Sequence, residues 1–262
     1  MSSVDDLERL LVQHLRVHRG EPEIRNPGQL SDDILDRYQR DRLLSMENQS
    51  CYGILPDFAR VLFNHLDPGM KTLETGVGVS TLVFALAETW HTAITPEGAE
   101  GCALRLFANT AGIDLSRVTF AVVPSERYLP TCNLRDLDVV FLDGKHAFPW
   151  PAIDWFYAAD CLKTGGLMIL DDIQLNSVRI VTEFMDVDPH WRFESNPGER
   201  TAIYRKLASP VHDVAWYMQP WVHEIKPPLY ARAVMQARRV TARVVRVTPL
   251  GRLLSSRQRR GP

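Results

Sequence analysis

Two short segments of this 262-residue chain combine acidic and histidine side chains in a pattern that could perform chemistry. Asp143 and His146 follow one short apolar run, and Asp171 and Asp172 follow another. If both runs are neighbouring strands, their ends lie roughly 5 Å apart, so these side chains converge at one edge of a sheet. Three crowded carboxylates repel one another unless a cation lies between them, and oxygen donors suit Mg²⁺. We therefore expect a magnesium site formed by Asp143, Asp171 and Asp172.

The histidine could serve as a general base in the same pocket. An imidazole has an ordinary pKa close to physiological pH, so His146 could accept a proton from a substrate hydroxyl. Each residue also has a purely structural explanation. Asp143 before Gly144 is typical of a side-chain turn, and His146 could be an ordinary surface residue. Asp171 or Asp172 could cap the helix that follows.

A turn containing two glycines lies where a short expected strand meets a helix. Gly76 and Gly78 would let the backbone approach a cofactor closely, and the helix N-terminus offers free N–H donors. Thr81 stands where the dinucleotide fingerprint requires its third glycine. Glu74 adds a negative charge that repels a pyrophosphate and suits a cationic ligand. S-Adenosylmethionine, with its sulfonium and ammonium groups, therefore fits better than NAD, and a plain tight turn is the structural alternative.

Three segments of the chain resemble motifs of class I S-adenosylmethionine-dependent methyltransferases. The first is the glycine turn, Glu-Thr-Gly-Val-Gly-Val-Ser-Thr at 74–81. The others are similar to the ends of the fourth and fifth strands in the small-molecule O-methyltransferase branch: Asp-Gly-Lys-His at 143–146 and Asp-Asp at 171–172. The resemblance covers roughly residues 55–206. It implies an α/β, Rossmann-like fold with a mostly parallel seven-stranded sheet in the order 3-2-1-4-5-7-6.

The resemblance also assigns roles to individual residues. It places S-adenosylmethionine against the glycine turn and the adjoining strand end, at Glu74, Thr75, Gly76, Gly78, Ser80, Thr81 and Asp143. It makes Asp143, Asp171 and Asp172 the ligands of a metal ion, which we expect to be Mg²⁺. His146 remains the expected catalytic base.

One position departs from the family pattern. The second strand of these enzymes usually ends in an acid that binds the cofactor ribose, and Thr95 stands at that position in this chain. Glu97 is the substitute that we expect, and Glu100 is the alternative.

Apolar periodicity places these motifs in alternating strands and helices, which is typical of an α/β fold. We expect strands at 71–75, 91–95, 118–123, 137–142, 167–170, 191–195 and 201–206. We expect helices at 4–18, 31–44, 56–65, 79–90, 98–110, 152–162 and 177–185. The chain then divides into an N-terminal helical cap (1–68), a methyltransferase domain (69–207) and a linker with a basic C-terminal extension (208–262).

The charge of the chain is unevenly distributed. The formal net charge is −2, but residues 1–224 carry −12, and residues 225–262 carry +10 without one acidic residue. A helix expected over 229–247 would place small apolar side chains on one face and arginines on the other. It could pack on this chain or on a second copy, or lie on an anionic membrane surface. Nucleic-acid binding is not expected, because aromatic residues are nearly absent among the arginines.

The composition is that of a globular protein, with 45% hydrophobic and 24% charged residues. The four cysteines show no metal-binding spacing and predict reduced thiols. With no signal sequence and no membrane-spanning run, we expect a cytoplasmic protein that could be peripheral to the membrane. The expected reaction is metal-assisted O-methylation of a small hydroxylated molecule, such as a sugar or a natural-product scaffold. The alternatives are a metal-independent methyltransferase or hydroxylase-like relative on the same fold, and a non-catalytic membrane-associated binding protein.

Overall fold

The computed structural model describes residues 16–18, 50–96, 98–209, 219 and 221–222. The chain divides into two units, Met1–Gln219 and Pro220–Pro262. The helices predicted at 31–44 and 229–247 lie outside the described residues. Within the described part, no helix combines the length and the apolar character needed to cross a bilayer.

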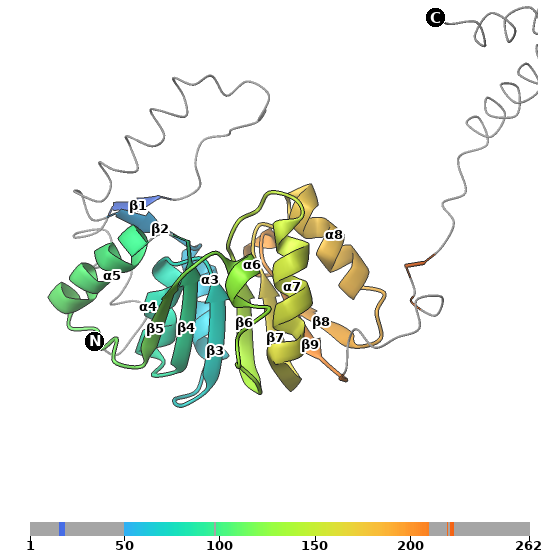
Figure 1. Ribbon diagram of the computed structural model, residues 1–262, viewed down its shortest axis with the longest axis horizontal. Coiled ribbons are helices and arrows are strands. Elements are labelled where there is room, and N and C mark those ends of the chain that lie inside the picture. Colours follow the sequence, from blue (N-terminus) through green and yellow to red (C-terminus); the bar gives the residue numbers. More distant parts are fainter. Residues whose placement is uncertain (1–15, 19–49, 97, 210–218, 220, 223–262) are drawn as a thin grey trace, which may run out of the picture. The chain divides into compact units, whose positions relative to one another are not determined.

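A seven-stranded sheet forms the centre of the first unit, with the strand order β5-β4-β3-β6-β7-β9-β8 (Figure 1). The strands are β3 (Lys71–Thr75), β4 (Trp90–Thr95), β5 (Val118–Val122), β6 (Leu137–Leu142), β7 (Leu162–Leu170), β8 (Trp191–Ser195) and β9 (Ala202–Lys206). The first five strands in this order are parallel, and β9 is antiparallel to both β7 and β8. The predicted order 3-2-1-4-5-7-6 is therefore confirmed. The parallel strands bring their carboxyl ends to one edge, where the predicted site residues lie.

Helices pack on both faces of the sheet. One face carries α3 (Pro56–Asn64), α4 (Val79–Leu86) and α5 (Gly98–Ala111), and the other carries α6 (Ser125–Tyr128), α7 (Trp150–Cys161) and α8 (Asn176–Met185). A 3₁₀ turn, η2 (Pro197–Glu199), joins β8 to β9. Alternate residues of β6 enter the two cores: Val139 and Phe141 pack toward α3 and α4, and Val140 and Leu142 toward α7 and α8. This alternation is the two-residue period of a strand that is buried on both faces.

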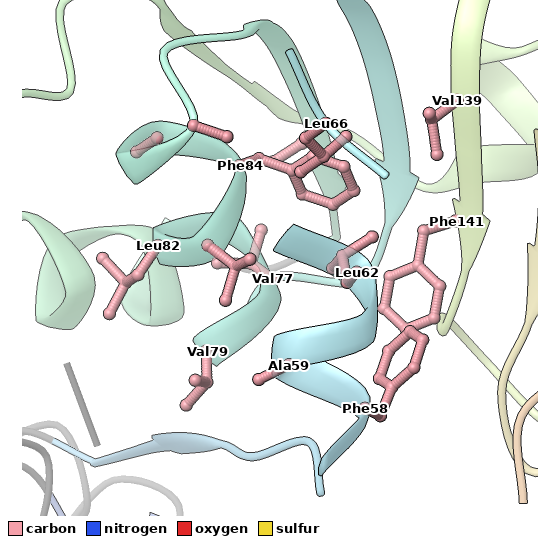
Figure 2. Packing of buried hydrophobic residues seen from close by; sticks show 14 of the residues in the cluster. Phe58, Ala59, Leu62, Leu66, Val77, Val79, Leu82, Phe84, Val139 and Phe141 are labelled. Carbon is pink, nitrogen blue, oxygen red and sulfur yellow. The ribbon is translucent and has the colours of Figure 1, made fainter. Parts of the chain in front are cut away.

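The core on the α3 side anchors the chain segment that leads into the cavity described below. Phe58 of α3 packs on Phe141 of β6 with ring centroids 5.3 Å apart (Figure 2), and both side chains are buried. Gly53 and Ile54, just before α3, line that cavity. The packing of Phe58 on Phe141 therefore holds α3, and with it the preceding residues of the cavity wall, against the sheet.

We expect Phe58→Ala to lower the free energy of unfolding by about 3–5 kcal/mol, because it leaves a cavity against Phe141. Phe58→Leu should cost less, since it keeps most of the apolar volume. Urea denaturation followed by circular dichroism measures both variants. A loss below about 1 kcal/mol for the alanine variant would contradict this view of the core.

Several element boundaries differ from the predicted ones. Helix α4 ends at Leu86 rather than near residue 90, because Glu88 adopts a left-handed φ of 53° and Trp90 already pairs with Lys71 in the sheet. Strand β7 begins at Leu162, which pairs with Leu137 before an irregularity in the ladder. Gly165 and Gly166 therefore lie inside this strand, which was predicted to begin only at residue 167. Helix α6 was not predicted, since four residues are too few to show a period.

The segments before α3 contain a short parallel pair of strands, β1 (Arg16–His18) and β2 (Ser50–Tyr52). Residues 16–18 had been placed at the end of a helix spanning 4–18, and that prediction is wrong for these three residues. Pairing with a segment far along the chain supplies their backbone hydrogen bonds, and local periodicity cannot reveal such a partner.

The structure describes the side chains of three of the four cysteines. Cys102, Cys132 and Cys161 are free. Sγ of Cys132 lies 3.9 Å from Sγ of Cys161, too far for a disulfide bond.

Candidate active site

A cavity of about 740 Å³ opens at the carboxyl edge of the central strands. Its walls come from the turn between β3 and α4, the ends of β4, β6 and β7, the start of α6 and the connection from β8 to β9. Five of the predicted cofactor residues line it together: Thr75, Gly76, Gly78, Ser80 and Asp143. The topology thus brings the glycine turn and the acidic strand ends into one site.

The glycine turn depends on having no side chain at Gly76. This residue has a φ of 96°, and a Cβ added to it would lie 2.3 Å from the backbone oxygen of Asp143. The turn therefore lies directly against the end of β6. Gly78 is the N-cap of α4, and its N–H donates to the Thr81 hydroxyl at 3.2 Å. The result is a narrow backbone cradle at a helix N-terminus, which fits close approach by a cofactor.

Glu74 lies beneath this turn, with only 1% of its surface exposed. The Ser80 hydroxyl donates to Glu74 Oε2 at 2.7 Å, and the Thr81 hydroxyl donates to Oε1. Nε2 of His91 lies 3.2 Å from the same Oε1. Glu74 and Thr81 are not among the residues that line the cavity. Their observed contacts hold the turn to the sheet, and direct contact of either residue with the cofactor stays a prediction.

Glu100 of α5 brings a carboxylate to Thr95, the residue at the expected ribose position at the end of β4. Thr95 Oγ1 donates to Glu100 Oε2 at 3.0 Å, and both residues line the cavity. Glu97, the first choice from the sequence, lies outside the described residues. Glu100 is therefore the ribose candidate that the structure places in the site.

His146 lies between two of the predicted carboxylates. Its Nε2 atom is 3.4 Å from Asp143 Oδ1 and 3.4 Å from Asp172 Oδ2. The possible ligand atoms of these three residues all lie within 4.8 Å of one another, which is compact enough to hold a metal ion. Asp172, two residues after the end of β7, has a left-handed φ of 58°, a conformation that aspartate tolerates better than most residues.

Asp171 also lines the cavity but is engaged elsewhere. It is buried, and its Oδ1 accepts a hydrogen bond from the Thr201 hydroxyl. It does not belong to the compact group formed by Asp143, His146 and Asp172. The structure therefore brings all three predicted metal carboxylates to one wall, with Asp171 set apart by its bond to Thr201, the residue before β9.

Arg200 is a site residue that the sequence analysis did not identify. Its Nη2 donates to Asp172 Oδ1 and lies 4.0 Å from Asp171 Oδ2, and the residue lines the cavity. The signal lies in the topology, because Leu170 pairs with Ala202 and so places the residues before β9 beside the end of β7. A guanidinium here neutralises part of the charge of the acidic wall.

The crowding of charges shifts several pKa values. Burial raises the pKa of Asp143 to about 7, although its hydrogen bond to His146 opposes the rise and the charges of Asp171 and Asp172 add to it. Burial alone would lower the pKa of His146, but Asp143 and the two other carboxylates raise it above its ordinary value. Burial also raises the pKa of Asp171, and the Thr201 hydroxyl opposes that rise. Perturbed groups gathered in a cavity are typical of a catalytic site.

Comparison with known proteins agrees with this geometry. Residues 73–173 match the model of a family described as a methyltransferase domain. No protein with a curated description matches the sequence. Cofactor-bound Rv0187 from MTB is 15% identical with a TM-score of 0.52, over 68% of this chain and 98% of that protein.

Two O-methyltransferases are among the other similar structures. TomG from Streptomyces achromogenes, involved in tomaymycin synthesis and in complex with SAM, is 16% identical with a TM-score of 0.51, over 69% of this chain and 92% of its own. A putative O-methyltransferase from Klebsiella pneumoniae is 16% identical with a TM-score of 0.52, over 79% and 98%. At this identity the structures establish the shared fold.

The strand order is that of the Rossmann-like fold, which this chain shares with the similar O-methyltransferase structures. The match of residues 73–173 to the methyltransferase domain covers both the glycine turn and the acidic strand ends.

Proposed function

We propose that this chain is an S-adenosylmethionine-dependent methyltransferase that methylates a hydroxyl group of a small molecule, such as a sugar or a natural-product scaffold, with the help of a divalent cation. The observation that carries the proposal is the position of His146, which lies between two carboxylates in the same cavity as the glycine turn. A base beside the cofactor site suits an acceptor that must lose a proton, as a hydroxyl does.

The residues present fit a divalent cation. Asp143 and Asp172 each offer a carboxylate oxygen to the cavity, and oxygen donors suit Mg²⁺. Mn²⁺ accepts the same ligands and tolerates a nearby imidazole. A cation held there would lower the pKa of the acceptor hydroxyl and neutralise its developing charge. We assign Asp143 and Asp172 as the ligands. His146 is not assigned as a ligand, because it cannot bind the cation through Nε2 and accept a proton on that same atom. Asp171 supports the wall of the site through its bond to Thr201.

The chain's own residues then perform three tasks. The glycine turn and Glu100 hold S-adenosylmethionine, whose cationic sulfur is favoured by the acidic wall. His146 accepts the hydroxyl proton, and the carboxylates beside it stabilise the imidazolium that results. The acceptor oxygen bonds to the methyl carbon as the carbon–sulfur bond breaks, and the electron pair stays on sulfur. Alignment of the two reactants in one cavity supplies much of the acceleration.

Chelation is expected to stop turnover reversibly. EDTA should reduce methyl transfer by at least about 100-fold, and Mg²⁺ or Mn²⁺ should restore it, because the cation acidifies the acceptor. The assay is release of S-adenosylhomocysteine with a panel of hydroxylated acceptors. Full activity in EDTA would refute the metal-assisted reaction.

Binding of the cation should strengthen as the pH rises. The ligand Asp143 must lose its proton, and its pKa lies near 7, so the affinity for Mn²⁺ should increase about tenfold between pH 6 and pH 8. Isothermal titration calorimetry in buffers of different ionisation enthalpy would also detect the released proton. Asp160→Asn, an exposed change on α7, should show the same pH dependence as the wild type. An affinity that does not change over this range would contradict the role of Asp143.

The contact between Arg200 and Asp172 favours one alternative, a metal-independent methyltransferase. The guanidinium already supplies a positive charge to the acidic wall. In that reaction His146 would act as the base without a cation, and the activity in EDTA would depend on Arg200. Comparing the wild type with Arg200→Gln in EDTA separates the two mechanisms.

A further inference from the structure

A buried histidine near the start of β4 has no part in the reaction proposed above. His91 has 1% of its surface exposed and does not line the cavity. It lies four residues before Thr95, so roughly 13 Å of strand separates it from the edge of the sheet where the cavity opens. A buried imidazole needs polar neighbours for its ring nitrogens. Those neighbours indicate what the residue holds in place.

His91 contacts strand β3 through both ring nitrogens. Its Nδ1 atom lies 2.8 Å from the Thr72 hydroxyl, and its Nε2 atom lies 3.2 Å from Glu74 Oε1. Nε2 forms no directed hydrogen bond within the described part of the chain, so its contact with the Glu74 carboxylate is an electrostatic one. Thr72 is the register partner of His91, and Glu74 lies two residues further along β3, on the same face of the strand. The histidine therefore lies beside the carboxylate that holds the glycine turn.

Glu74 in turn binds the first turn of α4. The hydroxyls of Ser80 and Thr81 donate to its two carboxylate oxygens. The Thr81 hydroxyl also accepts the Gly78 N–H at 3.2 Å, and both Gly78 and Ser80 line the cavity. A shift of the Glu74 carboxylate would therefore move residues that form the cofactor cradle.

Phe84, on the last turn of α4 (Figure 2), is held by the same group of residues. The His91 ring stacks on the Phe84 ring, with centroids 4.2 Å apart and an interplanar angle of 11°. The Thr89 hydroxyl donates to the Phe84 carbonyl at 3.0 Å and lies 3.0 Å from the Thr72 hydroxyl. Contacts at both ends of a helix fix the direction of its axis. His91 therefore helps to aim the N-terminus of α4, which is the end that faces the cofactor cradle.

We propose that His91 is a positioning residue for S-adenosylmethionine, which acts by holding Glu74 and α4 so that the glycine turn keeps the geometry that the cofactor requires. The inference rests on the proposed cofactor and does not depend on the metal ion or the acceptor. A wild-type chain that does not bind S-adenosylmethionine would refute both proposals. Wild-type binding with an unchanged Kd in the variants below would overturn this inference alone.

The test measures binding of S-adenosylmethionine by calorimetry, at a temperature where circular dichroism shows each variant folded. His91→Phe keeps a ring against Phe84 and removes both nitrogens, so Kd should rise at least about tenfold as Glu74 loses its neighbour. Thr72→Val removes the partner of Nδ1 and should raise Kd at least about threefold. The matched control is Thr182→Val, which removes another buried hydroxyl, bonded within α8 on the other face of the sheet. This control should stay within about twofold of the wild type, because the two sites are independent.

The ring ¹⁵N signals of His91 provide a readout that a general loss of stability does not move. Saturation with S-adenosylmethionine should shift these signals in the wild type, because the cofactor acts on Ser80 and Glu74. The ring signals of His190, which pairs with Asp188 and does not line the cavity, should stay in place. The His91→Phe spectrum assigns the signals.

A double-mutant cycle tests whether His91 acts through the first turn of α4. Ser80→Ala should weaken cofactor binding, and Ser80→Ala combined with His91→Phe should bind about as well as His91→Phe alone. An unchanged Kd in His91→Phe, additive losses in the cycle, or His91 signals that do not respond to the cofactor would each overturn the proposal. If His91→Phe does not fold, Thr72→Val carries the test, and an unchanged Kd in that variant overturns it.

Discussion

Replacement of His146 by alanine is expected to reduce methyl transfer by roughly 10²–10⁴-fold, the range that general-base catalysis supplies. The residue lies 3.4 Å from both Asp143 and Asp172 and is the imidazole placed to receive the acceptor proton. S-Adenosylmethionine binds mainly to the glycine turn, so its Kd should stay within about twofold of the wild type. Single-turnover kinetics and calorimetry measure the two quantities.

A matched control is His190→Ala. His190 pairs with Asp188 at 2.6 Å and does not line the cavity, so its loss should leave turnover unchanged. If His146→Ala lowered cofactor affinity and turnover by the same factor, His146 would be a structural residue. If turnover fell while Mn²⁺ binding was retained, His146 would be the base and not a metal ligand.

Replacement of Gly76 by alanine is expected to abolish cofactor binding. The new Cβ would lie 2.3 Å from the backbone oxygen of Asp143, and no side-chain rotation can relieve a clash with backbone. The left-handed φ of 96° adds strain of about 1–3 kcal/mol for any residue with a side chain. The turn must therefore move away from the end of β6, and we expect Kd for S-adenosylmethionine to rise at least about 100-fold.

Gly165→Ala is a control that introduces backbone strain similar to that of Gly76→Ala but no clash of the new Cβ with backbone. Gly165 has a similar φ of 85°, but a Cβ there would meet nothing within 4 Å. It should lower the melting temperature modestly and leave cofactor affinity intact. Equal cofactor affinity in Gly76→Ala and Gly165→Ala would show that close contact of the turn with β6 is not needed for binding.

The parallel sheet and the location of the acidic residues could be predicted because their signals are local, whereas the strand order was implied by the resemblance to class I methyltransferases. Short apolar strands between helices predict a parallel sheet, and the parallel order places Asp143 and Asp172 at one edge. The position of Glu74 could not be predicted in this way. Its charge suggested contact with the cofactor, but its bonds to Ser80 and Thr81 depend on how α4 packs against β3.

Arg200 is a site residue that could not be predicted from the sequence. Arg200 reaches Asp172 only because β9 inserts between β7 and β8, a pairing with no signature in the residues near position 200. Contacts between distant segments are set by tertiary packing, which local periodicity does not encode.

Native mass spectrometry of the purified chain with S-adenosylmethionine and Mn²⁺ tests the central claim most directly. We predict one cofactor molecule and one metal ion per chain. The cofactor should be absent from Gly76→Ala, and the metal should be absent after chelation and from Asp172→Asn. A chain that binds no S-adenosylmethionine under these conditions, or that binds it equally well in Gly76→Ala, would contradict the account.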